Sequence, residues 1–290
     1  MIYKHIYLLI FTFVGLIHAS LSLDLIIFSF DRPMQLYALL ESIQTRWTGI
    51  SHATVLYRAS NADFEKAYQT TLQDFSHVTF QRHFGKHDFQ NITTDIIRKS
   101  QSTHLFFGVD DIIVTDECDL EECLHTLETT NAYCFALRLG KNTTECYTCN
   151  LITPNPTFNA LDNSILSFQF GESKGDWDYP NSLDMTIYRR NTVIDFINGN
   201  YEWAHPNFME GQWACIAPKN VTGLCCMQSK IVNIPMNVVN VDWESRNMKN
   251  YSTHELVALF NDGYRIDINC VYKYLPRAPH EEINLTFTKK

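Results

Sequence analysis

Two adjacent carboxylates interrupt the apolar stretch HLFFGVDDIIV (residues 104–114), and they are the first candidates for chemistry in this chain. Strand-forming residues precede Asp110 and Asp111 and resume after them, which places the pair at the end of a buried strand. A buried carboxylate is costly unless it is paired, hydrogen-bonded or bound to a metal. We therefore expect a cation or a basic group beside the pair. The alternative is a turn in which one aspartate is a cap and the other is solvated.

Polar side chains follow two earlier apolar stretches in the same way. The stretch LDLIIFSF ends at Phe30 and leads into Asp31 and Arg32, and the stretch ATVLYRAS delivers Arg58 and Ser60. Asp31 and Arg32 also precede a proline, so they could form an ordinary turn into a helix. The three places become informative together if the fold brings them to one edge.

The order of the segments predicts such an edge. Apolar runs typical of strands alternate with segments of helical periodicity, which gives the order βαβαβαβ. This alternation predicts the α/β class, as a single domain with a mainly parallel central sheet covered by helices. Ligands of such sheets bind beyond the carboxyl ends of the strands. The strands are expected near residues 23–30, 53–59, 77–83 and 104–110, all directed toward one rim.

The convergence of arginines and aspartates at one rim fits the binding of a nucleotide diphosphate through a divalent cation. Asp111, together with Asp110, would hold Mg²⁺ or Mn²⁺ between the two phosphates. The ion would neutralise the charge on the leaving diphosphate. Asp110 could instead accept hydrogen bonds from ribose hydroxyls, and Arg32 or Arg58 could bind phosphate or line the base pocket.

The second half of the chain offers candidates for a general base. Glu210 lies in PNFMEGQW, before a run suited to a helix, and Asp176 and Asp178 lie in GDWDYP. A carboxylate whose pKa is raised by partial burial could remove a proton from an acceptor hydroxyl. The alternatives are a glutamate favoured by the helix dipole and aspartates that stabilise a turn.

Aromatic and histidine side chains in the same half could complete a site. Aromatic faces suit sugar rings, although tryptophan is more often part of a core. A histidine could be a third metal ligand, but the spacing does not select one. The aromatic candidates are Trp177, Tyr179, Trp203 and Trp213, and the histidines are His205, His254 and His280.

Length, composition and charge limit the class of protein. The chain has 290 residues, of which 45% are hydrophobic, and no linker-like segment divides it. A formal charge of −9 argues against a nucleic-acid surface. Residues 1–22 resemble a signal peptide or a signal anchor, with Lys4 before a short apolar run. We therefore expect export or entry to a secretory pathway and a domain at residues 23–290. A cytoplasmic or membrane-anchored location stays open, with membrane association only through the N-terminal segment.

The nine cysteines do not form a familiar metal motif. Only one C-x-x-C pair occurs, Cys146 and Cys149, whereas a zinc ribbon requires two. Export would permit disulfides. Disulfides or plain buried thiols are the favoured interpretations.

Several of these segments resemble one family of enzymes. FSFDRPMQLYALLESI, VLYRASN and HLFFGVDDIIV resemble GT-A-fold glycosyltransferases of the family 2-like nucleotide-diphospho-sugar type, with the aspartate pair in place of the DxD metal motif. AYCFALRLG, GDWDYPNSLDMTIYRR and HPNFMEGQWA resemble the acceptor half of bacterial relatives. The resemblance implies Asp111 at the metal and Phe30, Asp31 and Arg58 near the nucleotide. Inverting members commonly carry a Glu-Asp pair where this chain has Glu210 followed by glycine, so Glu210 matches only loosely.

The resemblance implies a metal-assisted, inverting glycosyltransferase that moves a sugar from a nucleotide sugar donor to a carbohydrate or glycoconjugate acceptor. Two other classes remain open. An inactive GT-A-like domain could bind a glycan or a protein, which export would favour. A metal-dependent phosphohydrolase would also use paired aspartates, although Asp31 is followed by Arg-Pro rather than by the second aspartate of that pattern.

Overall fold

The computed structural model describes residues 20–239 and 246–290. Most of the predicted signal segment, residues 1–19, lies outside the described residues. Within the described ranges, no helix combines the length and the apolar character needed to cross a membrane. Ser22 is already part of the folded unit, because its backbone and hydroxyl exchange hydrogen bonds with Thr103 over 3.0–3.1 Å. The last residue of the predicted signal segment is therefore packed against the domain.

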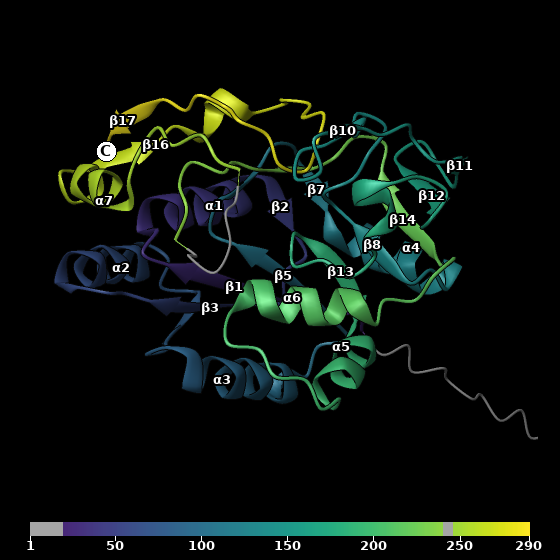
Figure 1. The fold of residues 1–290 in the computed structure, drawn as a ribbon, viewed down its shortest axis with the longest axis horizontal. Coiled ribbons are helices and arrows are strands. Elements are labelled where there is room, and N and C mark those ends of the chain that lie inside the picture. Colours follow the sequence, from purple (N-terminus) through teal and green to yellow (C-terminus); the bar gives the residue numbers. More distant parts are fainter. Residues whose placement is uncertain (1–19, 240–245) are drawn as a thin grey trace, which may run out of the picture.

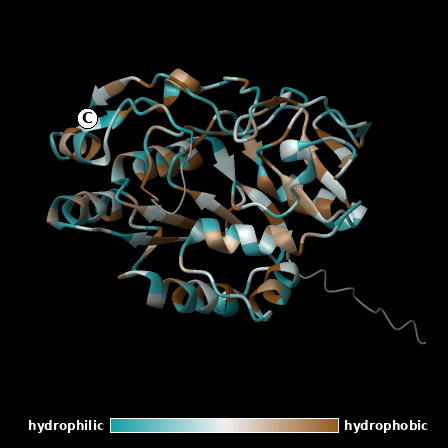
Figure 2. Cartoon of the chain, viewed as in Figure 1, coloured by the Kyte–Doolittle hydropathy of each residue, from teal (hydrophilic) through white to brown (hydrophobic). Residues whose placement is uncertain are grey.

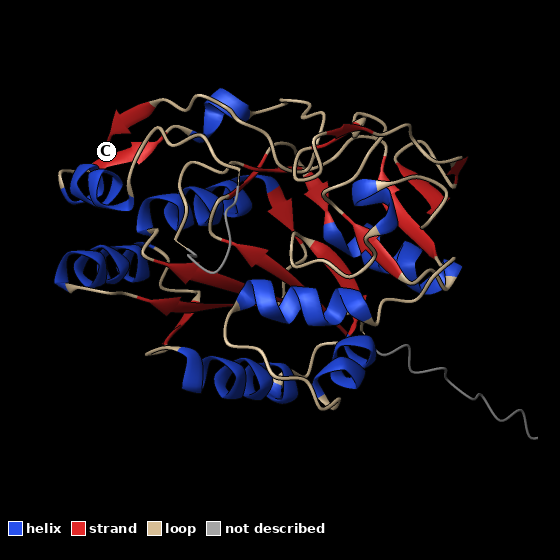
Figure 3. Cartoon of the chain, in the orientation of Figure 1, coloured by secondary structure: helices blue, strands red, loops and turns tan. Residues whose placement is uncertain are grey.

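One large central sheet organises the described part of the chain, with strand order β11-β12-β14-β8-β13-β5-β1-β3-β4 (Figures 1 and 3). Its strands are β1 (Leu23–Phe30), β3 (His52–Arg58), β4 (Thr79–Arg82), β5 (His104–Val109), β8 (Cys134–Ala136), β11 (Asn159–Ala160), β12 (Ile165–Gln169), β13 (Thr186–Arg189) and β14 (Thr222–Cys226). Shorter pairs lie around it: β2 (Trp47–Thr48) with β7 (Cys118–Asp119), β6 (Ile112–Val114) with β15 (Ile231–Asn233), β9 (Glu145–Cys146) with β10 (Leu151–Ile152), and β16 (Tyr264–Ile266) with β17 (Phe287–Lys289).

The half of the sheet built from the N-terminal segments is parallel, as predicted. Strand β1 pairs in parallel with β3 and β5, and β3 pairs in parallel with β4. The register places Phe30 opposite Arg58 and Phe28 opposite Val109, so the polar residues that follow these strands meet at one rim. The other half is mixed, because β13 runs antiparallel to both β5 and β8.

Helices cover both faces of the sheet, which confirms the predicted α/β architecture. They are α1 (Pro33–Arg46), α2 (Ala62–Asp74), α3 (Lys86–Lys99), α4 (Leu120–Thr130), α5 (Arg190–Ile197), α6 (Pro206–Cys215) and α7 (Thr253–Asn261), with the 3-10 turns η1 (Gly175–Asp178) and η2 (Ile268–Val271). Helices α1, α2 and α7 lie on one side, and α3, α5 and α6 lie on the other (Figure 1).

Strand β1 shows why two layers of helices are needed. Leu25 and Ile27 belong to one apolar cluster, and the alternating residues Ile26 and Phe28 belong to the other. Burying a side chain of this size contributes about 1.5–3 kcal/mol, so a strand that is apolar on both faces requires cover on both. Figure 2 shows these central strands as predominantly hydrophobic, while the helices carry hydrophilic residues.

Local signals fix where the helices begin. Asn61 caps α2 by accepting hydrogen bonds from the N–H groups of Asp63 and Phe64. Ser252 caps α7 and forms a capping box with Glu255. Helix α1 starts with Pro33, whose missing N–H costs nothing in the first turn.

The β6–β15 pair and the C-terminal segment complete the rim. The N–H of Ile234 donates to the carbonyl of Asp111 over 2.8 Å, directly after β15. Asn233 bonds to the backbone of Pro279 and Glu281, so the segment that contains His280 lies beside β15. Residues distant in sequence are thereby brought to the carboxyl ends of β1, β3 and β5.

Candidate active site

Arg32 is the basic group that stands beside the aspartate pair. Its Nη1 donates to Oδ1 of Asp110 over 3.0 Å and to Oδ2 of Asp111 over 2.8 Å. Its Nε donates to Oδ1 of Asn237 over 2.9 Å, and its Nη2 donates to the Asn237 carbonyl. The three charged side chains are only 5–12% exposed. The expectation of a cation or basic group beside the pair is confirmed, and the group is an arginine.

Asp110 joins the ends of β5 and β1. Its Oδ2 accepts the Ser29 hydroxyl over 2.9 Å and the N–H of Phe30 over 3.1 Å, while its Oδ1 binds Arg32. Burial raises the pKa of Asp110 to about 6, although Arg32 opposes the shift. Both carboxylate oxygens accept hydrogen bonds from protein groups, so the role of Asp110 is to hold the end of β1 and Arg32 in place.

The other predicted nucleotide-side residues also lie together. Asp31 adopts a left-handed backbone conformation with φ of 53°, and its Oδ1 accepts the N–H of Ser60 over 2.8 Å. Its own N–H donates to the carbonyl of Arg58 over 3.2 Å. The guanidinium carbon of Arg58 lies 4.6 Å from the centre of the Phe30 ring. The ends of β1 and β3 therefore form one continuous surface, to which Ser60 contributes through its backbone.

Glu210 lies one turn into α6 and points toward a second acid. Its Oε1 accepts the N–H of Leu183 over 2.8 Å. Burial raises the pKa of Glu210 to about 7, and the negative charge of Asp184 adds to the shift. Asp184 is 8% exposed, and its Oδ2 lies 3.4 Å from Nε2 of His280. Burial also raises the pKa of Asp184, with His280 opposing the shift and Asp111 adding to it. Charges thus interact from Asp111 through Asp184 to Glu210.

Sequence reasoning missed Asp184 and two amide side chains. Asp184 lies in SLDMTIY, which reads as a turn before a strand. The unusual backbone of its neighbour Met185, with φ of 44°, is visible only in the structure. Among the described residues, the buried Gln35 amide and Nδ2 of Asn237 have no hydrogen-bond partner. Gln35 lines a small cavity together with Asp110 and Asp111. These unpaired groups are therefore available to a ligand.

Other candidates are not brought to this rim. Asp178 is exposed on η1, and its neighbour Asp176 instead binds the buried Arg138, with Nη1 of Arg138 at 2.9 Å from Oδ1 of Asp176. His254 lies against the ring of Phe64 and His205 lies against that of Phe208. His280 alone of the three histidine candidates reaches the carboxylates.

The tryptophans belong to the core. Trp177, Trp203 and Trp213 are only 0–3% exposed and pack in the cluster under α3, α5 and α6. The alternative that tryptophan is part of the core therefore holds for these three, and none of them is exposed to contact a sugar, because large apolar rings next to a sheet are buried by the hydrophobic effect. Tyr179 is partly exposed, and burial raises the pKa of its hydroxyl well above the usual range.

The acids fit a hard divalent cation that is not enclosed by protein alone. Asp110, Asp111, Asp184 and Glu210 are offset at close range by Arg32 and His280. Burial raises the pKa values of Asp110, Asp184 and Glu210, and the negative charge of neighbouring carboxylates adds to each shift. No three acid or histidine ligand atoms in the described residues lie within 4.8 Å of one another. Mg²⁺ suits such a place, because it takes one or two carboxylates and completes its shell with phosphate and water.

No protein-family model matches the chain. It is similar to the bifunctional glycosyltransferase pgtA of Dictyostelium discoideum, with 32% identity over 176 residues. That match covers 54% of this chain and 22% of the relative, so the chain spans about a fifth of its length. The resemblance to glycosyltransferases that the motifs indicated is thereby confirmed.

Solved structures resemble the chain more distantly. TarS residues 1–349 of S. aureus gives a TM-score of 0.46 with 9% identity, covering 70% of this chain and 60% of that one. The 4-diphosphocytidyl-2C-methyl-D-erythritol synthase of Anaerococcus prevotii gives a TM-score of 0.40 with 11% identity, covering 77% and 92%.

Proposed function

We propose that the chain transfers a sugar from a nucleotide-diphosphate donor to a carbohydrate or glycoconjugate acceptor, with the help of Mg²⁺ or Mn²⁺ and with inversion at the anomeric carbon. The observation that carries the proposal is the row of interacting acids from Asp111 through Asp184 to Glu210 at the carboxyl ends of the parallel strands. The match to a glycosyltransferase supports it.

The donor side of the site follows from the ends of β1 and β3. Arg58 over the Phe30 ring and the Asp31–Ser60 contact provide polar and aromatic groups for a nucleotide. The guanidinium of Arg32 can bind phosphate oxygens in place of the aspartates. Asp111, with Asp184 and His280 nearby, would hold the divalent ion, which would neutralise charge on the leaving diphosphate.

Glu210 is the proposed general base. It takes the proton of the acceptor hydroxyl as that oxygen bonds to the anomeric carbon, while the bond from this carbon to the diphosphate oxygen breaks. The attack from the face opposite the leaving group inverts the configuration. A pKa of about 7 suits this role, because a base is most effective when its pKa is near the working pH. The raised pKa supports Glu210 even though its neighbour Gly211 departs from the common Glu-Asp pattern.

Calorimetric titration with a panel of nucleoside diphosphates, with and without Mn²⁺, tests the donor site. We expect binding that requires Mn²⁺, and Asp111→Asn should weaken it by about tenfold or more, because the amide keeps the shape but loses the charge. Asp195→Asn, an exposed position on α5, is the matched control and should bind as wild type.

Equal binding by wild type and Asp111→Asn, or no binding by either, would contradict the metal-dependent transferase. The inactive, glycan- or protein-binding domain would then take its place. Release of phosphate from a generic phosphate ester, lost in Asp111→Asn, would favour the phosphohydrolase instead.

A further inference from the structure

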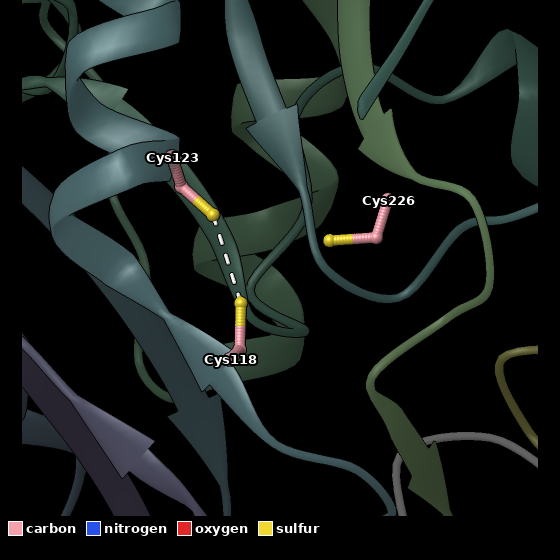
Figure 4. Close-up of side chains that lie close together, drawn as sticks. All are labelled: Cys118, Cys123 and Cys226. Carbon is pink, nitrogen blue, oxygen red and sulfur yellow. Dashed lines mark hydrogen bonds between the residues drawn. The ribbon is translucent and has the colours of Figure 1, made fainter. Parts of the chain in front are cut away.

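Three cysteine sulfurs meet inside the domain, in a group separate from the carboxylates. Cys118 comes from β7, Cys123 from the first turns of α4 and Cys226 from the end of β14 (Figure 4). Their Sγ atoms all lie within 4.8 Å of one another, and those of Cys118 and Cys123 are 3.6 Å apart. Cys123 and Cys226 are 2% and 6% exposed, while Cys118 is half-buried. All nine cysteines of the chain are free thiols, so these three are not committed to disulfides.

We propose that Cys118, Cys123 and Cys226 bind one thiophilic metal ion, such as Zn²⁺, as three thiolates. Zinc–sulfur bonds of about 2.3 Å at tetrahedral angles place the sulfurs about 3.8 Å apart, close to the spacing found here. A disulfide requires about 2.05 Å between two sulfurs and would leave the third sulfur outside the bond. Water would be the fourth ligand, on the side where Cys118 is only half-buried.

The surroundings can accept the charge of such a site. Three thiolates and a divalent ion leave one net negative charge. The Lys230 ammonium is close enough to Cys118 and Cys226 for their charges to interact, and it is held by Asp116 at 2.6 Å. Asp116 is also bound by Lys273 at 2.9 Å, so Lys230 can offset part of the remaining negative charge.

The ion would connect parts of the chain that support the rim. Cys118 follows β6 and Cys226 precedes β15, and these two strands pair with each other. Strand β6 leads back to Asp111, and β15 leads on to Asn237, which binds Arg32. The ion is therefore a structural link behind the carboxylates. The sequence concealed it, because Cys226 is far along the chain from the other two, and the absence of a second C-x-x-C pair argued against zinc.

Titration of the reduced, metal-free chain with Zn²⁺ against a chromophoric chelator tests the site. We expect one tightly bound ion per chain. Cys123→Ser and Cys226→Ser should each weaken this binding by about 100-fold or more, since each removes a ligand. Cys215→Ser and Cys270→Ser, at exposed thiols outside the group, are the matched controls and should bind as wild type. Asp111→Asn should also retain the ion, which separates this site from the one at the rim.

Cys118→Ser, at the half-buried position, is a further variant in case the two buried positions do not tolerate the change. The number of Zn²⁺ ions bound by the wild type also tests the proposal without any variant. The proposal is overturned if the wild type binds no Zn²⁺ at micromolar concentration, or if group and control variants bind it equally. It is also overturned if peptide mapping without reductant finds two of the three cysteines joined by a disulfide.

Discussion

Arg32 is the basic group in contact with the aspartate pair at the rim. It is the cation that offsets Asp110 and Asp111, and all three side chains are nearly buried. Removing one partner of a buried ion pair leaves a charge without compensation, which costs about 3–5 kcal/mol. The stability of the rim therefore depends on this guanidinium.

Replacing Arg32 tests this dependence. Arg32→Met should lower the free energy of unfolding by about 3–5 kcal/mol. Adding Asp110→Asn should restore part of this loss, because it removes one of the two carboxylate charges left without a cation. Lys99→Met, which breaks an exposed pair with Asp95, is the control and should cost less than about 0.5 kcal/mol. Urea denaturation measures all of them. Equal losses for Arg32→Met and Lys99→Met would refute the buried pair.

Glu210 gives a second prediction at the same scale. Because its pKa is about 7, turnover should fall as the pH is lowered through 7 and the base becomes protonated. Glu210→Gln should bind the donor normally, lose about 10²–10⁴-fold in kcat and lose this pH step. Steady-state rates across pH provide the measurement. If the variant keeps the kcat of wild type, the general base is another group.

The same carboxyl also affects stability. Its folded pKa is raised above the ordinary value of 4.5, so the folded state holds the proton more tightly. The resulting stabilisation is present below about pH 4.5 and is lost as the pH rises through about 7. Glu210→Gln should therefore gain stability relative to wild type over that window, as thermal unfolding at pH 5 and pH 8 can show. A stability difference that does not change with pH would contradict the raised pKa.

At the scale of elements, close contacts between loops support the ends of the strands. A Cβ at Gly140 would lie 2.3 Å from the backbone N of Ser229 and 2.6 Å from the backbone C of Gln228. These backbone atoms cannot move without disturbing the connection from β14 to β15. The segment after β8 can therefore pack this closely against the connection only because residue 140 is a glycine.

Gly140→Ala should destabilise the chain by about 1–3 kcal/mol, because the extra methyl overpacks this contact. Gly211→Ala is the matched control. Nothing lies within 4 Å of its Cβ, and it is inside α6, so alanine should stabilise by about 0.5–1 kcal/mol. Denaturant midpoints of both variants decide the matter. A neutral Gly140→Ala would mean that the two loops separate readily.

Local patterns were sufficient to predict the parallel half of the sheet. Continuous apolar runs act over a few positions, so the sequence shows them directly. The contacts of Asp184, Asn237 and His280 depend on segments that return from far along the chain, and no local pattern records them. Proximity in sequence to the candidate acids did not predict proximity to the site, because the tryptophans near those acids are buried in the core.

Across the whole molecule, the C-terminal segment fastens distant parts together. Arg277 accepts hydrogen bonds from Thr144 and Glu145, Pro279 accepts one from Asn233, and β17 pairs with β16. His280 therefore lies between segments that are bound to the rest of the domain on both sides of it in the sequence. The segment lies along one edge of the molecule in Figure 1, from the region near β10 to α7.

Ending the chain at Leu285 should loosen this segment. The change removes β17 and its pairing with β16, and a net loss of about 1 kcal/mol would lower Tm by about 2–4 °C. Removing Lys290 alone is the control, because it leaves β17 in place and deletes only a partly exposed ion pair with Glu41 and one backbone hydrogen bond to Gly263. Calorimetry compares the two. An unchanged Tm for the shorter chain would mean that β17 contributes nothing to stability.

The contact between Arg32 and the aspartates also affects the order in which ligands bind. An arginine already bound to the acids competes with any metal ion from solution. The apparent affinity for a free ion is then reduced by the small fraction of molecules in which the acids are released. An ion that arrives already chelated by a diphosphate brings phosphate oxygens, which give Arg32 a new partner. We therefore expect the ion and the nucleotide to enter as one complex rather than in sequence.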